Sequence, residues 1–163
     1  MGKVKVALAG IGNNSSALVQ GVHYYRAFQA RHAEAEVPGI RRHAIDGLGV
    51  GDLEFVTAFD VAASKVGKDL SEAIFATPNN YPRLEVQVPD GEGAVQPGIT
   101  EVGEADEEIA RIAGALAESG AEVLVYALPR GDNGPPRLMA RQRYEAAPPT
   151  STPLQSWWRA IPS

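Results

Sequence analysis

A pair of glycines between a strand-like segment and a helix-like segment constrains this chain more than any other feature. Residues 3–9 alternate between apolar and polar and then become wholly apolar, which predicts a buried strand. Gly10 and Gly12 follow directly, and the polar residues after them are typical of a helix N-terminus. We expect polar side chains to cap that helix. The candidates for this role are Asn13, Asn14 and Ser15.

The rest of the chain repeats this alternation of strand and helix patterns. The segments are Leu53–Asp60 and 122–128 as buried strands, 62–76 and 105–118 as helices, 84–88 as a short strand, and 34–51 as a loop rich in glycine. Strands that alternate with helices are typical of a parallel sheet with crossover helices. We therefore predict an α/β fold, a Rossmann-type parallel sheet with flanking helices.

The glycine turn is the strongest chemical signal in the sequence. Gly10 permits a tight turn, and Gly12 lets the backbone approach a pyrophosphate because no Cβ stands in the way. The free N–H groups at the start of the helix would then face negative charge. The third glycine of the G-x-G-x-x-G fingerprint is replaced by Ser15, so a tight turn without a ligand stays an alternative.

Asp60 is the acidic residue that ends the second predicted strand. In dinucleotide sites such a carboxylate binds the adenosine ribose hydroxyls and disfavours a 2′-phosphate. It lies 48 residues after Gly12 instead of the usual ~20, a difference that the insertion at 34–51 accounts for. The alternative role of Asp60 is to cap the next helix. Asn79 and Asn80 either turn a loop or contact a ligand, and the residues leave both readings open.

Charge and composition exclude several classes of function. The body at 1–128 carries a net charge of −8, which argues against nucleic-acid binding, and 129–163 carries +3. The chain has no cysteine, and its three histidines lack metal-ligand spacing, so we predict no metal site. No apolar run reaches the ~18 residues of a membrane span. We therefore expect a cytoplasmic protein with no membrane or nucleic-acid partner.

A change in composition near Pro129 predicts two regions. Seven of the 12 prolines and both tryptophans lie in 129–163. Proline at this density opposes long helices and central strands. We expect an NAD-binding Rossmann-like domain at 1–129 and a divergent, irregular, poorly ordered tail at 130–163. The bias of the tail toward Arg, Pro, Ser, Ala and Trp suggests a frameshift or an early stop, which would make this a truncated relative of a longer protein.

Several stretches together point to a known family. They are 6–13, 18–25, 55–60, 65–76, 79–80, 96–100 and 123–129. In this order and with compatible gaps, they resemble the prokaryotic myo-inositol phosphate (inositol-3-phosphate) synthases over about 3–129. The resemblance implies tightly held NAD and the conversion of glucose 6-phosphate to inositol phosphate by oxidation at C5, an intramolecular aldol step and reduction. Inositol and phospholipid biosynthesis would then be the pathways concerned.

The resemblance also implies which residues surround the cofactor. The set is Gly10, Gly12, Asn13, Asn14 and Ser16 at the pyrophosphate, Asp60 at the adenosine ribose, and Asn79 and Asn80 near the cofactor. Asn14 replaces a cysteine that is common in the family, and Val102 replaces an aspartate. The family's catalytic lysines lie in a later domain, and none of the four lysines here matches them. The resemblance therefore implies an isomerase's NAD-binding half that is inactive alone, with no catalytic residue.

Two other hypotheses remain beside this one. The chain could be a stand-alone dinucleotide-binding or regulatory module that docks on a full-length homologue, with Trp157 and Trp158 as aromatic anchors. It could also be a different Rossmann oxidoreductase of unusually short form, which the family-like stretches disfavour. A sheet that lacks its later strands exposes an apolar edge, so we also expect self-association of the isolated chain.

Overall fold

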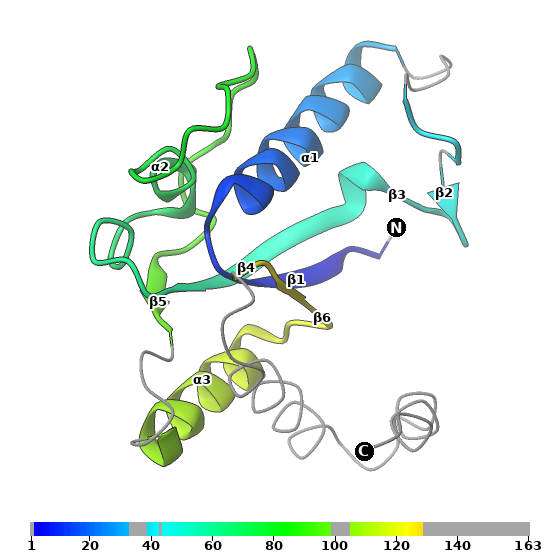
Figure 1. The fold of residues 1–163 in the computed structure, drawn as a ribbon. Helices are drawn as coiled ribbons and strands as arrows, with labels where there is room; N and C mark the ends of the chain where they lie inside the picture. The colour runs from blue at the N-terminus through cyan, green and yellow to red at the C-terminus, as the bar shows by residue number, and fades with distance from the viewer. Residues whose placement is uncertain (1, 33–38, 43, 99–104, 129–163) are drawn as a thin grey trace, which may run out of the picture.

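The computed structural model describes residues 2–32, 39–42, 44–98 and 105–128, and its centre is a four-stranded parallel sheet (Figure 1). The strands are β1 (Val4–Ala9), β4 (Leu53–Asp60), β5 (Val95–Pro97) and β6 (Val123–Tyr126). Their spatial order is β5-β4-β1-β6, and each neighbouring pair is parallel. In chain order this is 3-2-1-4, the arrangement at the centre of a Rossmann sheet. The expected α/β fold class is thereby confirmed.

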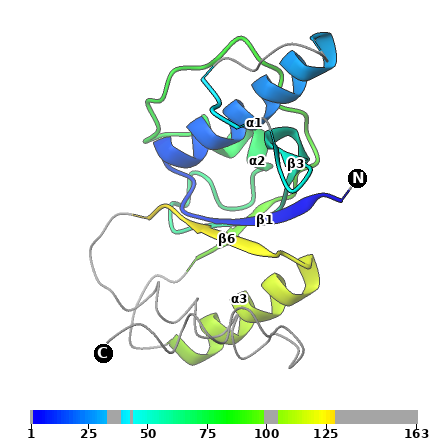
Figure 2. The same ribbon diagram turned by 90° about the vertical axis from the view of Figure 1, so that its right-hand side faces the viewer.

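Helices cover both faces of this sheet. Figure 2 shows α1 (Asn13–Arg31) and α2 (Leu70–Ala73) on one side and α3 (Ala105–Ser119) on the other. Alternate residues of β1 supply the two cores, because successive side chains of a strand point to opposite faces. Val6 and Leu8 pack in the core with α1, whereas Ala7 and Ala9 pack in the core with α3.

The apolar stripe of α3 agrees with its sequence pattern. Ile109, Ile112 and Leu116 are all buried against the sheet. The helix ends where expected, at Gly120, whose φ of +64° is a left-handed conformation that glycine adopts at low cost. The spacing of three apolar residues and one glycine was therefore enough to predict this element.

The prediction of a loop over 34–51 was wrong in its described part. Ala44–Ile45 (β2) and Leu48–Gly49 (β3) form a short antiparallel hairpin, and the 3₁₀ turn Val50–Asp52 (η1) leads into β4. Asp46 and Gly47 both have positive φ, as a two-residue hairpin turn of this hand requires. An Asp-Gly pair is a hairpin signal, and the glycine content of the segment obscured it.

The predictions over 62–88 and for the last strand also need correction. The helix expected over 62–76 is confined to α2, because the chain at 67–68 pairs with β5: Gly67 N donates to Val95 O, and Val95 N donates to Lys68 O, each over 2.8 Å. No strand forms at 84–88, and β5 lies later. The strand β6 is half-buried, with Val123 42% exposed, because it is an edge strand of the described sheet. The predicted tail at 130–163 lies outside the described residues.

Asp69 caps α2, and its contacts make fold stability depend on pH. Burial raises the pKa of this carboxyl, but hydrogen bonds from Ser71 and Gly91 outweigh that effect, so its pKa lies below the ordinary 3.8. A lowered folded-state pKa stabilises the fold above the unfolded-state pKa, and this contribution is lost as pH falls through the folded-state value.

We expect Asp69→Ala to cost about 1 kcal/mol of stability at neutral pH, which is typical of a lost N-cap. The difference from wild type should shrink as pH falls below 3.8, the ordinary pKa of the carboxyl. Urea unfolding at several pH values measures this, with Asp69→Asn as the variant that retains a capping oxygen. A deficit that stayed constant down to acid pH would contradict the role of the charge.

Candidate functional site

A cavity of about 510 Å³ opens at the carboxyl ends of β1, β4 and β6. Its lining comprises Gly10, Gly12, Asn13, Asn14, Asp60, Val61, Ala62, Lys65, Pro78, Asn79, Ala127 and Leu128. The strand order reverses between β1 and β6, since the strands that follow β1 in the chain lie on either side of it. Ligands of open α/β sheets bind at such a switch point, outside the carboxyl ends of the strands.

The N-terminus of α1 has no side-chain cap, contrary to the sequence prediction. Its N-cap residue is Gly12, and the first helical hydrogen bond runs from Ser16 N to Gly12 O over 2.9 Å. Within the part of the chain that is described, the N–H groups of Asn13, Asn14 and Ser15 have no acceptor. An uncapped N-terminus of a 19-residue helix carries partial positive charge and is suited to bind an anion.

The side chains expected to cap this helix have other partners. Asn13 Oδ1 accepts from Asn80 N over 3.0 Å and from Tyr81 N over 3.2 Å, while its Nδ2 donates to Asn80 Oδ1 over 2.6 Å. Ser15 Oγ donates to Gly10 O over 2.5 Å. These side chains hold the turn and the 80–81 segment in place, and so the helix N–H groups stay available.

The two glycines of the turn have different roles. Gly10 has a φ of +90°, and a Cβ there would lie 2.8 Å from the backbone nitrogen of Leu128, so only glycine fits. Gly12 has an ordinary φ of −83°, and a Cβ there would meet no atom within 4 Å. Gly10 is thus required by packing, whereas Gly12 leaves open space beside the helix N-terminus.

Asp60 lines the cavity but is 4% exposed, and its two oxygens have partners within the chain. Oδ2 accepts from Ile11 N over 2.5 Å, and Oδ1 accepts from Ala62 N over 2.8 Å. A carboxylate offers about four lone-pair sites, so acceptor capacity remains for a ligand hydroxyl. The carboxylate therefore both fixes the glycine turn and borders the cavity, and no helix follows it directly.

Lys65 is a site residue that the sequence analysis missed. It is 3% exposed and lines the cavity. Its Nζ donates to Ile11 O over 2.7 Å and to Asn79 Oδ1 over 2.8 Å, and it lies 4.0 Å from Asp60 Oδ2. The predicted helix at 62–76 would have placed this lysine on an ordinary helix surface, so the sequence pattern held no signal for its burial.

The remaining predicted residues differ in their relation to the cavity. Asn79 lines it, and its Nδ2 donates to Ile11 O over 2.9 Å and to Ile74 O over 2.8 Å. Asn80 contacts the turn only through Asn13. Ser16 is fully buried and does not line the cavity, and its Oγ accepts from Gln20 Nε2 over 3.2 Å. The structure thus brings six of the eight predicted side chains or glycines to the cavity wall.

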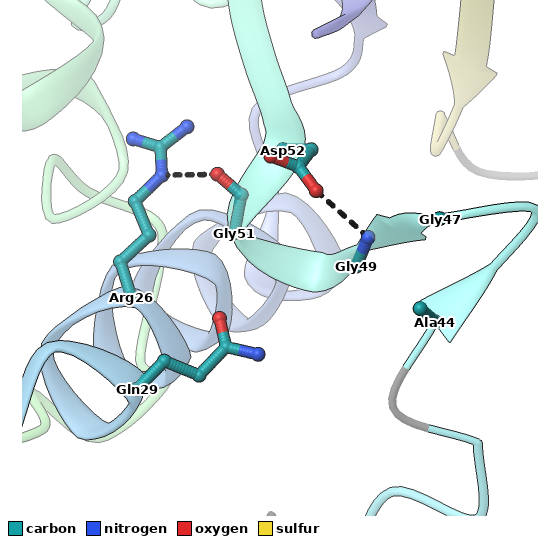
Figure 3. Close-up of a pocket in the computed structure, with 7 residues that line it drawn as sticks. All are labelled: Arg26, Gln29, Ala44, Gly47, Gly49, Gly51 and Asp52. Atoms are coloured by element: carbon teal, nitrogen blue, oxygen red, sulfur yellow. Dashed lines mark hydrogen bonds between the residues drawn. The ribbon is translucent and has the colours of Figure 1, made fainter. Parts of the chain in front are cut away.

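A second cavity of about 430 Å³ lies between α1 and the hairpin (Figure 3). Its polar groups serve the fold: Arg26 Nε donates to Gly51 O over 2.9 Å, and Asp52 Oδ2 accepts from Gly49 N over 2.8 Å. His23 is a packed histidine, with Nε2 2.9 Å from Glu92 Oε1. The described residues include no cluster of potential metal ligands and no helix able to cross a membrane.

The fold and site define an α/β protein of the Rossmann-like class, with an anion-ready helix N-terminus at the switch point of its sheet. No family model matches the chain. It is 38% identical to inositol-3-phosphate synthase of Mycolicibacterium smegmatis, over 89% of this chain and 42% of that protein. It is 36% identical to the enzyme of the same name from Corynebacterium glutamicum, over 88% and 41% of the two chains.

Solved structures support the fold. A crystal structure of Ari2 superposes with a TM-score of 0.82 at 45% identity, and covers 88% of this chain and 43% of that one. A myo-inositol-1-phosphate synthase-related protein from Thermotoga maritima gives 0.51 at 23% identity, over 88% and 41%, which supports the fold alone. This chain is therefore similar, over most of its length, to a segment of inositol-3-phosphate synthases, as the resemblance implied.

The extent of the match adds two facts. The chain spans less than half the length of the relatives it matches. An alignment over 89% of 163 residues cannot end at residue 129, so the similarity continues into the region that the sequence analysis took to be divergent.

Proposed function

We propose that this chain binds NAD in the cavity at the switch point, as the dinucleotide-binding segment of a protein related to inositol-3-phosphate synthases. The observation that carries the proposal is the uncapped N-terminus of α1, which opens beside the space at Gly12 into a cavity of about 510 Å³. The N–H groups of residues 13–15 offer donors for a diphosphate. Gly12 itself lines this cavity, and a Cβ there would meet no atom within 4 Å.

The other proposed cofactor contacts follow from the cavity lining. Asp60 has remaining acceptor capacity for a ribose hydroxyl, and Asn14 and Asn79 border the same space. When bound, NAD would supply hydride transfer. The chain's own residues would hold the diphosphate, orient the ribose and enclose the cofactor between the glycine turn and residues 127–128 at the end of β6.

We also propose that the role of this chain lies in the isomerase reaction of inositol biosynthesis, the reaction of its relatives. The cavity's described lining has one cationic side chain, Lys65, whose Nζ is already bound by Ile11 and Asn79. Stabilising an enolate would need a further cation or donor. We therefore propose that the chain alone does not convert glucose 6-phosphate to inositol phosphate. Self-association, docking on a full-length homologue and a cytoplasmic location stay predictions.

Thermal melting with increasing NAD tests the binding. A ligand at 100 times its Kd stabilises the native state by about 2.7 kcal/mol, and in a domain of this size that raises the melting temperature by about 5–10 °C. Asp60→Asn should reduce the NAD-dependent rise, whereas Asp69→Asn, at a carboxylate outside the cavity, should leave it intact. A well-folded wild-type chain that shows no rise at millimolar NAD would contradict the proposal.

A further inference from the structure

The peptide groups of Ile11, between the two glycines of the turn, are bound on both sides by segments far along the chain. Asp60 Oδ2 accepts from its N–H over 2.5 Å. Its carbonyl oxygen accepts from Lys65 Nζ over 2.7 Å and from Asn79 Nδ2 over 2.9 Å. The carbonyl group of Ile11 therefore has two strong donors and the N–H group one charged acceptor, which fixes the orientation of the turn.

Lys65 is the central member of this group. Its ammonium is buried, and an isolated buried charge is costly unless it is paired and hydrogen-bonded. Two of its three donors are engaged by Ile11 O and Asn79 Oδ1, and the carboxylate of Asp60 lies 4.0 Å away. These contacts compensate the charge, and all of them join Lys65 to residues around the glycine turn.

We propose that Lys65 is a positioning residue for the dinucleotide site, an inference that rests on the proposed function. By binding the Ile11 carbonyl, it prevents that oxygen from turning toward a bound diphosphate, which would repel it. By binding Asn79, it holds a second donor on the same carbonyl. Its charge also offsets the carboxylate of Asp60, so that the buried negative charge beside the turn does not oppose an anionic ligand.

The test is a double-mutant cycle on the full chain with Asp60→Asn, Lys65→Met and both together. Each single variant leaves one buried charge without its partner, which destabilises the fold, whereas the double variant removes both and keeps the net charge of the site. Lys68→Met is the matched control, because Lys68 is an exposed lysine three residues away. Calorimetry gives the Kd for NAD, and melting gives the stability of the ligand-free chain.

We expect the double variant to regain the melting temperature that the single variants lose, while its affinity for NAD stays about tenfold weaker than that of Asp60→Asn. Hydrogen exchange in the ligand-free double variant should rise in a peptide spanning 9–16 and not in one spanning β6. Lys68→Met should match wild type in both affinity and stability.

Two results would overturn the inference. In the first, NAD affinity recovers together with stability in the double variant, as expected if Lys65 only supports the fold. In the second, Lys68→Met weakens NAD binding as much as Lys65→Met does. A folded wild-type chain that binds no NAD would instead overturn the proposed function, and this outcome is separate because it appears before any variant is compared.

Discussion

Replacing Gly12 with valine is expected to weaken NAD binding by about 100-fold and to cost the fold only about 1 kcal/mol, because valine is a poorer N-cap residue than glycine. Gly12 has a φ of −83° and a ψ of −165°, an extended conformation that any residue adopts without strain. A Cβ there meets no atom within 4 Å, so the ligand-free chain has room for it. The added methyl groups would occupy the space proposed for the diphosphate, and such overpacking costs about 1–3 kcal/mol.

Calorimetry and melting of the same samples measure the two effects separately. Gly21→Ala is the matched control, because Gly21 lies in the same helix and a Cβ there also meets nothing within 4 Å. It should raise stability by about 1 kcal/mol and leave NAD affinity unchanged. If Gly12→Val bound NAD like wild type, the cavity beside the helix N-terminus would not be the diphosphate site.

Replacing Gly10 with alanine is expected to destabilise the fold by about 3 kcal/mol. Two costs combine at this position. The φ of +90° is strained for any residue with a side chain, at about 1–3 kcal/mol. The new Cβ would also lie 2.8 Å from the backbone nitrogen of Leu128, and backbone at the end of an edge strand can move only by disturbing its pairing with β1.

Gly91→Ala separates these two costs, because Gly91 has a similar φ of +96° but open space around a Cβ. We expect it to cost about 1 kcal/mol, which is the conformational part alone. Urea unfolding measures the loss of unfolding free energy in both variants. The larger loss in Gly10→Ala is then the cost of the close contact with Leu128. Equal losses for the two glycines would show that β6 shifts at no cost and that this packing does not define the turn.

Sequence reasoning was most successful where a local pattern decides the structure. The strand Leu53–Asp60 has the predicted bounds, and β1 and α3 differ from theirs by one residue. Sequence reasoning found the glycine turn and Asp60 because two glycines or an acidic residue stand out at the end of an apolar, buried strand. They meet at the cavity because parallel strands align their carboxyl ends, which the alternation of elements already implied.

The failures at 62–76 and at Asn13 share a physical cause, since long-range pairing outweighed local preference there. The apolar spacing at 62–76 favoured a helix. In the structure the first half of this segment is not helical, and residues 67–68 form hydrogen bonds with β5. Lys65 lies in that half, so its burial followed from the same pairing. Asn13 and Ser15 are residue types that often cap helices, but their side chains form hydrogen bonds with Asn80 and Gly10 instead.

The hydrogen bonds that hold the N–H and carbonyl groups of Ile11 affect the order in which the chain folds during synthesis. These three bonds join residues that lie 49, 54 and 68 positions apart in the chain. A nascent chain that has emerged only as far as Gly12 thus contains the glycines of the turn but not the residues that hold Ile11 in place. The turn becomes rigid only after residue 79 has left the ribosome and β4 has paired with β1. Under the proposed function, NAD binding at this turn would therefore come late in folding, after these long-range hydrogen bonds have formed.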